Sequence, residues 1–273
     1  MTEEGGAPGG ALYVVATPIG NLADVTLRAI ETLRTVPLIA AEDTRISRRL
    51  LARHGIDTRL TSFHVRSGPA RLATLLEHLR GGADLALVSD AGTPLVSDPG
   101  ADLVAAWVAE GGRVVPIPGA SSVLAAVVAA GLTEPRWSFE GFLPRTGRDR
   151  RERLAAIAAD PRGTVLFEAP SRAAATLRDL AAACGAGRPS AVCRELTKVH
   201  EQVVRGDLAD LVGALATGAS SAGTSDEESA LAAARAEVQR LVEAGTARGD
   251  AARRVSAATG IPRRRLYDVA DRL

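Results

Sequence analysis

Three loops in the first half of the chain carry residue types that bind small molecules through backbone and hydroxyl groups. Each follows an apolar run and consists mainly of Gly, Pro and small or hydroxyl residues, at 17–21, 89–94 and 118–122. Glycine has no Cβ and proline fixes a turn, so backbone in such loops can approach a ligand closely. Loops at the carboxyl ends of neighbouring strands line the crevice in which open α/β sheets bind ligands. The pattern predicts a binding cleft.

Asp90 and two serines supply polar side chains in these loops. The Asp90 carboxylate can accept hydrogen bonds from ligand hydroxyls or amines, and Gly92 permits close approach. The alternative is that Asp90 and Asp98 only cap turns, as Asp often does. Ser121 and Ser122 precede an apolar helix whose free N–H groups attract anionic groups, and N-capping alone explains them equally well.

Lys198 is the one lysine among 33 basic residues, and it lies in the polar segment 194–201 between two expected strands. A neutral lysine amine can accept a proton, which an arginine guanidinium does not do. Arginine would serve here if positive charge alone were needed. The pattern therefore favours a functional Lys198 over an incidental surface lysine.

Two further segments place charge at the ends of expected strands. Residues 42–45 combine two carboxylates with Arg45, which we interpret as a solvated ion-pair cluster. Residues 168–172 end in Arg172, which either holds a carboxylate or phosphate or only decorates a helix start. One histidine, His200, lies in the polar segment 194–201. The other three lack metal-ligand spacing, so we expect no metal; they are His54, His64 and His78.

Apolar runs alternate with helical spacing along most of the chain, which predicts an α/β fold with a mainly parallel sheet. In the first half we expect strands at 11–17, 36–41, 85–89 and 114–117, and helices at 22–33, 47–54, 71–81, 100–110 and 123–131. In a second α/β block we expect helices at 150–159, 171–183 and 208–215, and strands at 164–167, 190–194 and 201–205.

Composition shifts along the chain predict the domain boundaries. Residues 133–147 are rich in Pro, Gly and aromatics, 216–229 are rich in Gly, Ala and Ser, and 248–273 hold seven Arg against three Asp. We expect three short helices at the end, broken at Gly245 and 260–262. The expected parts are a flexible tail at 1–10, an N-terminal α/β domain at 11–132, a linker at 133–149, a second α/β domain at 150–215, a linker at 216–230 and a basic helical extension at 231–273.

Composition also bounds the compartment and the partners. Cys184 and Cys193 fit neither a redox pair nor a zinc cluster, which favours a reduced cytosolic compartment. The amino terminus is acidic and Gly-rich, unlike a signal peptide, and the longest apolar run, 123–132, is too short to span a bilayer. We expect a soluble cytoplasmic protein without a membrane partner. Aromatics make up 3% of the chain, so platforms for stacking single-stranded nucleic acid are scarce.

Several strings in this order resemble the tetrapyrrole methylase superfamily, and most of all its bacterial subgroup that 2′-O-methylates a cytidine, cytidine 1402, of 16S rRNA. TPIGNL, SDAGTP and RELTK separate this subgroup from the tetrapyrrole enzymes. The matching stretches are YVVATPIGNLADVT at 13–26, AEDTRIS at 41–47, LVSDAGTPLVSDP at 87–99, PIPGASS at 116–122, FEGFLP at 139–144, LFEAPSR at 166–172 and CRELTKVHEQVVRG at 193–206.

The resemblance implies two α/β domains of tetrapyrrole methylase type with S-adenosylmethionine in the cleft between them, plus a small C-terminal helical extension. It also implies a homodimer that acts on 16S rRNA within the small ribosomal subunit. The residues expected to bind the cofactor are Pro18, Gly20, Asp90, Gly92, Thr93, Ser121 and Ser122.

The same resemblance implies where the substrate lies. Something must take the proton of the ribose hydroxyl, and Lys198, if neutral, is the first candidate and Glu168 the second. The residues expected to bind the substrate are Thr44, Arg45, Arg172 and Arg194.

The chain departs from the family pattern after Asp207. The family usually adds a strand with a Gly-Glu pair and an aliphatic run, whereas 213–235 reads as small residues and acids. The basic extension is expected to grip rRNA phosphates, or else to form a solvated Arg-rich bundle.

Two other functions remain open: methylation of a tetrapyrrole such as a precorrin in an apolar cleft, and RNA-binding assembly without catalysis. A nicotinamide-dependent oxidoreductase is disfavoured because the dinucleotide fingerprint is absent from the sequence.

Overall fold

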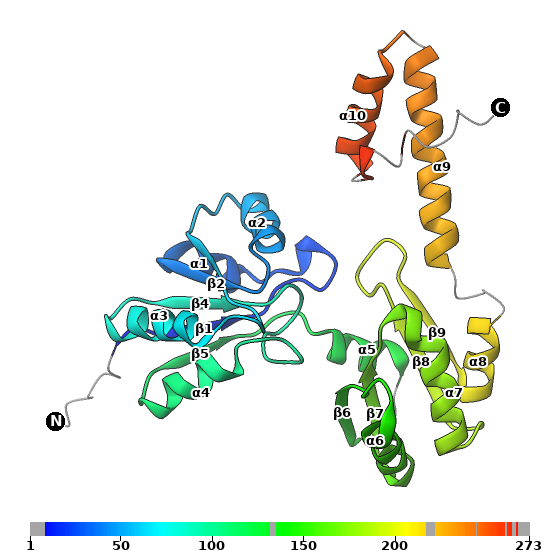
Figure 1. Cartoon of the computed structure of the whole chain (residues 1–273), viewed down its shortest axis with the longest axis horizontal. Coiled ribbons are helices and arrows are strands. Elements are labelled where there is room, and N and C mark those ends of the chain that lie inside the picture. Colours follow the sequence, from blue (N-terminus) through cyan, green and yellow to red (C-terminus); the bar gives the residue numbers. More distant parts are fainter. Residues whose placement is uncertain are drawn as a thin grey trace. The chain divides into compact units, whose positions relative to one another are not determined.

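The computed structural model describes residues 9–131, 135–216, 222–243, 245–259, 261–263 and 266. The chain divides into two compact units, Met1–Leu211 and Val212–Leu273 (Figure 1). The first unit holds the strands and most of the helices, and the second is helical in its described part.

A five-stranded parallel sheet forms the first half of the first unit, in the order β3-β2-β4-β1-β5. Because the strands are parallel, their carboxyl ends meet at one edge, where the loops of the candidate site begin. The mainly parallel sheet predicted from the sequence is confirmed. Its strands are β1 (Leu12–Val15), β2 (Leu38–Ala41), β3 (Leu60–Ser62), β4 (Leu85–Val88) and β5 (Val114–Ile117).

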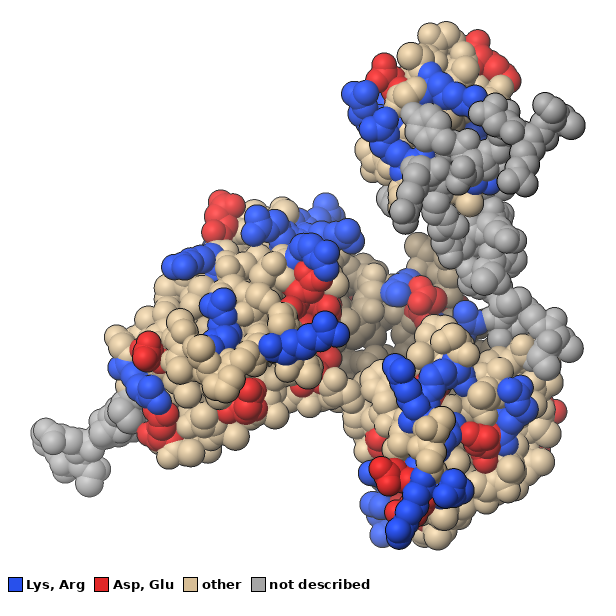
Figure 2. All heavy atoms as spheres, in the orientation of Figure 1, with Lys and Arg blue, Asp and Glu red and all other residues tan. Residues whose placement is uncertain are grey.

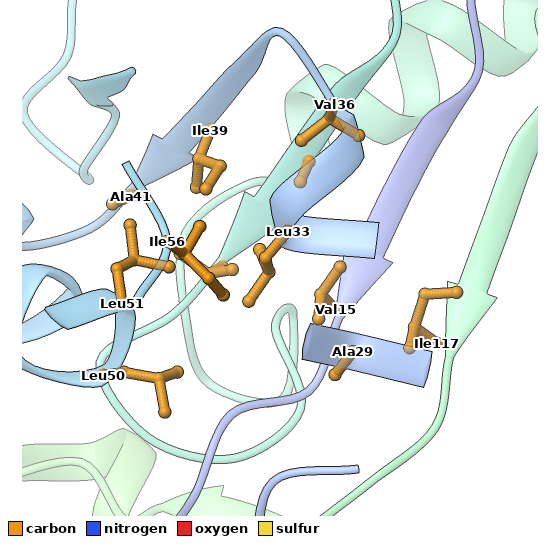
Figure 3. Close-up of a cluster of buried hydrophobic side chains, with 12 residues drawn as sticks. Val15, Ala29, Leu33, Val36, Ile39, Ala41, Leu50, Leu51, Ile56 and Ile117 are labelled. Carbon is orange, nitrogen blue, oxygen red and sulfur yellow. The ribbon is translucent and has the colours of Figure 1, made fainter. Parts of the chain in front are cut away.

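Helices cover both faces of this sheet, and alternating side chains of the strands point to opposite faces. On one face Val15, Ile39 and Val88 pack against α1 and α2, in the cluster drawn in Figure 3. On the other face Leu12 and Leu87 pack against α3 and α4. Burying each such side chain stabilises the fold by roughly 1.5–3 kcal/mol. The covering elements are η1 (Leu22–Asp24), α1 (Leu27–Thr35), α2 (Thr44–Arg53), α3 (Pro69–Arg80) and α4 (Ala101–Ala109).

The second half of the first unit contains two small sheets. Strands β6 and β7 pair in parallel, and β8 and β9 pair antiparallel. Helix α5 precedes this half in sequence but packs on β8 and β9. The Cys193 thiol lies 3.8 Å from the Ala126 carbonyl of α5, and Arg205 donates to the Ala129 carbonyl. The elements are α5 (Ser122–Ala130), β6 (Trp137–Phe142), α6 (Gly147–Ala159), β7 (Gly163–Phe167), η2 (Pro170–Arg172), α7 (Ala173–Cys184), β8 (Pro189–Arg194), β9 (Gln202–Asp207) and α8 (Leu208–Ala216).

A buried arginine ties α6 to α7. Arg150 is 8% exposed, and its guanidinium donates to the Asp179 carboxylate at 2.7 and 2.9 Å, to Thr176 Oγ1 at 3.0 Å and to the Pro144 carbonyl at 2.9 Å. Each of the three guanidinium nitrogens thus finds an acceptor, which favours burial of the charge. Arg150 is therefore a structural residue.

The second unit packs two helices, α9 (Ala222–Glu243) and α10 (Arg248–Thr259), around a small core. Gly245 adopts a φ of +89° between them, a conformation that favours glycine. The core residues are Leu231, Ala234, Val238, Ala251, Ala252, Val255 and Leu266.

The elements differ from the expected boundaries in four places. Residues 133–149, expected as a linker, contain β6 and the first turn of α6, because the β6 backbone pairs with β7. Residues 216–230, expected as a linker, contain the first turns of α9, whose sequence is dominated by good helix formers. A strand absent from our expectation, β3, pairs with β2. In the expected tail, Gly10 donates to the Leu79 carbonyl at 2.7 Å, while residues 1–8 lie outside the described part.

Candidate active site

Hydrogen bonds join the three predicted loops at the carboxyl edge of the parallel sheet. The Thr17 N–H donates to the Gly92 carbonyl at 2.8 Å, and the Gly92 N–H donates back to Thr17 at 3.0 Å. Thr93 Oγ1 lies 3.3 Å from the Ala120 carbonyl, which connects the second loop to the third. The structure thus brings together the loops that the sequence singled out.

Gly92 is required at the centre of this arrangement. Its φ of +84° lies in the left-handed region, and a Cβ there would stand 3.3 Å from Ile19 Cγ2. In the third loop, a Cβ on Gly119 would approach the Cβ of Ala16 to 3.0 Å. The absence of side chains at both positions is what lets the three loops meet.

Asp90 links the loop after β4 to the end of β2. Its Oδ1 accepts from the Asp43 N–H at 2.9 Å, and its own N–H donates to Glu42 Oε2 at 3.3 Å. Asp98 lies further along the same loop, close enough to Asp90 for their charges to interact. Burial raises the pKa of Glu42, Asp90 and Asp98 above their ordinary values. Nearby carboxylates add to each shift: Asp90 raises the pKa of Glu42 and of Asp98, and Asp43 raises that of Asp90. Half-buried negative charge of this kind suits a cationic ligand.

The third loop ends at the start of α5. Ser121 is the N-cap of this helix, and its hydroxyl accepts from the Leu124 N–H at 3.4 Å, so the capping interpretation holds. Ser122 is the first residue of α5. A capped helix start still presents N–H groups to an anionic group of a ligand.

A pocket of about 50 Å³ opens beside Pro18 and Asp90, between the sheet and helices α1 and α2. The Ser47 hydroxyl lines it and is buried, with no hydrogen-bond partner among the residues that the structure describes. Sites for whole cofactors usually enclose roughly 300–1,000 Å³. This pocket adjoins the first two loops and is too small for a complete S-adenosylmethionine.

The polar segment before β9 reaches the first loop. A Cβ on Gly20 would stand 2.6 Å from Lys198 Cγ and 3.0 Å from the Leu196 carbonyl, so these groups touch the Gly20 backbone. Lys198 Nζ donates to Glu195 at 3.1 Å. Glu195 and Thr197 adopt φ values of +49° and +66°, which are costly for residues with side chains. Such strain is concentrated at functional sites.

Glu168 lies in a hydrogen-bonded network of the second half. Its oxygens accept from Thr176 Oγ1 at 2.5 Å and from the Ala169 N–H at 2.8 Å, and Arg172 lies 3.5 Å away. Arg172 also reaches the Leu143 carbonyl at 3.4 Å. Within the described residues, no hydrogen bond joins Glu168 or Arg172 to the three loops.

The remaining predicted residues lie at element ends. Thr44 is the first residue of α2, whose N-cap is Asp43, and Arg45 forms a two-pronged ion pair with Asp43 while 88% exposed. This pair agrees with the solvated ion-pair cluster expected there. Arg194 ends β8, opposite Gln202 of β9.

Sequence reasoning missed two carboxylates of the site. The sequence interpretation places Glu42 in a solvated cluster and names Asp98 only as an alternative turn cap, yet both lie beside Asp90. The signal available was position, because Glu42 directly follows β2 and β2 lies beside β4 in the sheet.

Within the described residues, no group of three or more His, Cys, Asp or Glu side chains is arranged to hold a metal ion. Among the described helices, none combines the length and the apolar character needed to cross a membrane.

A parallel α/β sheet with glycine-containing loops and clustered carboxylates at its carboxyl edge is an architecture that binds small cofactors. Residues 11–212 match the profile of the tetrapyrrole (corrin/porphyrin) methylases, and the chain belongs to this family.

Curated relatives share most of their length with the chain. A Synechocystis protein named ribosomal RNA small subunit methyltransferase I is 44% identical over 96% of this chain and 97% of its own. Proteins of the same name from Bacillus subtilis and Mycobacterium bovis are 36% and 42% identical, over 98% and 95% of this chain and 96% and 94% of their own.

Solved structures share the fold. A cobalt precorrin-4 methyltransferase superposes with a TM-score of 0.58 at 21% identity, over 77% of this chain and 90% of its own. A uroporphyrin-III-C-methyltransferase from Thermus thermophilus gives a TM-score of 0.54 at 21% identity, over 75% of this chain and 88% of its own. The α/β fold of tetrapyrrole methylase type expected from the sequence is confirmed.

Proposed function

We propose that the protein transfers the methyl group of S-adenosylmethionine to the 2′-oxygen of a cytidine, cytidine 1402, in 16S rRNA of the small ribosomal subunit. The observation that carries the proposal is the joining of three loops around Asp90, in a chain whose relatives are named ribosomal RNA small subunit methyltransferase I. Because ribosomal subunits work in the cytoplasm, the proposal places the protein there.

The three loops at the carboxyl edge of the sheet fit the chemistry of this donor. Asp90, flanked by Glu42 and Asp98, offers negative charge to the cationic sulfonium and amino groups. The start of α5 offers N–H groups to the donor carboxylate. Bound S-adenosylmethionine supplies an electrophilic methyl group. The residues proposed to hold it are Pro18, Gly20, Asp90, Gly92, Thr93, Ser121 and Ser122.

The chain's own task is to align the ribose hydroxyl with the methyl carbon, to exclude water and to take up one proton. Lys198 is the first candidate for the proton acceptor, because it touches Gly20 in the first loop. Glu168 is the second candidate, and its oxygens already accept from Thr176 and Ala169. The residues proposed to hold the ribose and its phosphates are Thr44, Arg45, Arg172 and Arg194.

We also propose that two copies of the chain associate through α5. This helix reads SVLAAVVAA without a charged residue, and Leu124 and Val128 are 56% and 82% exposed. A helix that is apolar all round is normally buried. Light scattering should give a dimer mass for the wild type and a monomer mass for Leu124→Glu/Val128→Glu. Val108→Glu, at another exposed valine on α4, is the control and should remain dimeric.

The decisive test uses small subunits from a bacterium that lacks the modification. With tritiated S-adenosylmethionine, label should enter 16S rRNA and should resist alkali, because a 2′-O-methyl group blocks cleavage of the adjacent phosphodiester bond. Asp90→Ala should abolish labelling together with donor binding in calorimetry. Ribose methylation would be refuted if alkali released the label in mononucleotides. It would also be refuted if the label entered a tetrapyrrole and not rRNA.

A further inference from the structure

Helix α2 carries a row of arginines on one side. Arg45, Arg48, Arg49 and Arg53 recur at spacings of three and four residues, which places them on neighbouring turns of one helix face. We call these four residues the α2 arginine row. The helix sequence, TRISRRLLAR, contains no acidic residue. Figure 2 shows the basic side chains gathered over α2.

The row is separate from the face by which α2 packs on the sheet. Ser47, Leu50 and Leu51 are the buried residues of the helix, and all four arginines are exposed. Arg45 pairs with Asp43. Within the described residues, no hydrogen bond or ion pair engages the side chains of Arg48, Arg49 or Arg53.

Folding does not account for the row. Like charges four residues apart, as in Arg45 with Arg49 and Arg49 with Arg53, destabilise a helix. Arg53 lies in the last turn, where the helix dipole favours a cation, but Arg48 and Arg49 lack that benefit. The side chains of Arg48 and Arg49 are therefore available to an anionic partner.

The row starts at the candidate active site. Asp43, the N-cap of α2, donates its N–H to Asp90 Oδ1, so the first turn borders the carboxylates. At 1.5 Å per residue, Arg45 to Arg53 extends about 12 Å away from that edge. Successive phosphates of one strand advance about 3.4 Å along the axis of a nucleic-acid helix, so this length covers about three to four of them.

We propose that the α2 arginine row binds the phosphate backbone of rRNA beside the target nucleotide. The proposal rests on the proposed function, because RNA is the polyanion on which the methyl donor would act. A guanidinium group can donate two parallel hydrogen bonds to one phosphate, and such contacts do not depend on the nucleotide sequence. The carboxylates around Asp90 repel phosphate, so the row holds the backbone to one side of the donor.

The test compares two matched pairs of substitutions in the full chain. Arg48→Gln/Arg49→Gln removes the middle of the row. Arg59→Gln/Arg113→Gln removes two exposed arginines that directly precede β3 and β5, at the amino ends of the strands of the same sheet. Equilibrium binding to a 16S rRNA transcript is measured at several salt concentrations. The logarithm of the association constant falls linearly with the logarithm of the salt concentration. Losing two phosphate contacts should make this slope shallower by about 1.4 and weaken binding about tenfold near 0.15 M salt.

The control pair should change neither the affinity nor the slope. Calorimetry with S-adenosylmethionine checks that both variants are folded. Wild-type affinity and slope in the Arg48/Arg49 pair, or an equal loss in the control pair, would overturn the proposal. Failure of the proposed function looks different, because the wild-type protein itself would then transfer no methyl group to rRNA.

Discussion

Replacing Gly20 by alanine tests whether the contact between the first loop and Lys198 belongs to the active enzyme. The new Cβ would stand 2.6 Å from Lys198 Cγ, about 0.8 Å short of the 3.4 Å at which ordinary contacts begin. It would also stand 3.0 Å from the Leu196 carbonyl, which is backbone and cannot rotate away. The two segments must therefore separate by several tenths of an ångström.

The separation should cost activity and leave stability nearly unchanged. Gly20 is exposed and does not have a left-handed φ, so alanine adds no backbone strain. A misplacement of about 1 Å near reacting groups can lower turnover about a hundredfold. We expect a fall in kcat of about tenfold to a hundredfold in the methyl-transfer assay, with a melting temperature within a few degrees of the wild type.

Gly68→Ala is the matched control, because a Cβ at Gly68 meets nothing within 4 Å and its φ is −73°. It should retain wild-type kcat. If Gly20→Ala turns over as fast as Gly68→Ala, the contact with Lys198 is irrelevant to catalysis and the placement of the proton acceptor is refuted.

Three further predictions concern single side chains. Lys198→Ala and Lys198→Arg should both lower kcat about a hundredfold or more with donor affinity near wild type, and full activity in the arginine variant would exclude a proton acceptor at this position. Burial raises the pKa of Asp90, so its carboxylate takes up a proton sooner as the pH falls, and calorimetry should show donor affinity falling at a higher pH than a solvated Asp would give. Asp90→Asn should weaken binding about tenfold at neutral pH and flatten this fall, whereas an unchanged pH profile would exclude Asp90 as the donor's partner. The effect on stability runs the other way. Because folding raises the pKa of Asp90, its protonation as the pH falls increases the free energy of unfolding. Arg150→Gln should lower the free energy of unfolding in urea by about 2–3 kcal/mol, less than for a fully buried pair because Asp179 is 45% exposed. Arg148→Gln, in a pair whose arginine is 82% exposed, should cost less than about 0.5 kcal/mol, and equal costs for the two variants would contradict the structural role of Arg150.

Elements with long apolar runs could be predicted from the sequence, and short or irregular ones could not. Strand β5 occupies the four residues expected for it. Strand β3 has three residues, too few for a periodic signal, and exists because β2 offers it a hydrogen-bonding edge. Strand β6 changes register with β7 between Phe139 and Phe142, so its alternation is interrupted. Helix α2 begins at Thr44, three residues before the expected start, because the Asp43 side chain accepts from the Arg45 N–H.

The candidate site divides in the same way. Residue types alone pointed to the loops and to Asp90, since loops after the strands of a parallel sheet are where such folds bind ligands. The neighbours of Asp90 depend on strand order. Glu42 meets Asp90 because β2 lies next to β4, and local periodicity carries no information about which strands are adjacent. The approach of Lys198 to Gly20 likewise depends on how the second half folds.

The position of α5 affects how the chain can be divided for study. A recombinant fragment that stops at residue 131 would end with the apolar helix α5 and would lack β8 and β9, on which this helix packs in the intact protein. Such a fragment should aggregate during purification. Terminating expression before Ser121 would omit that helix and keep all five strands of the parallel sheet, but it would also remove the two serines that we propose bind the donor.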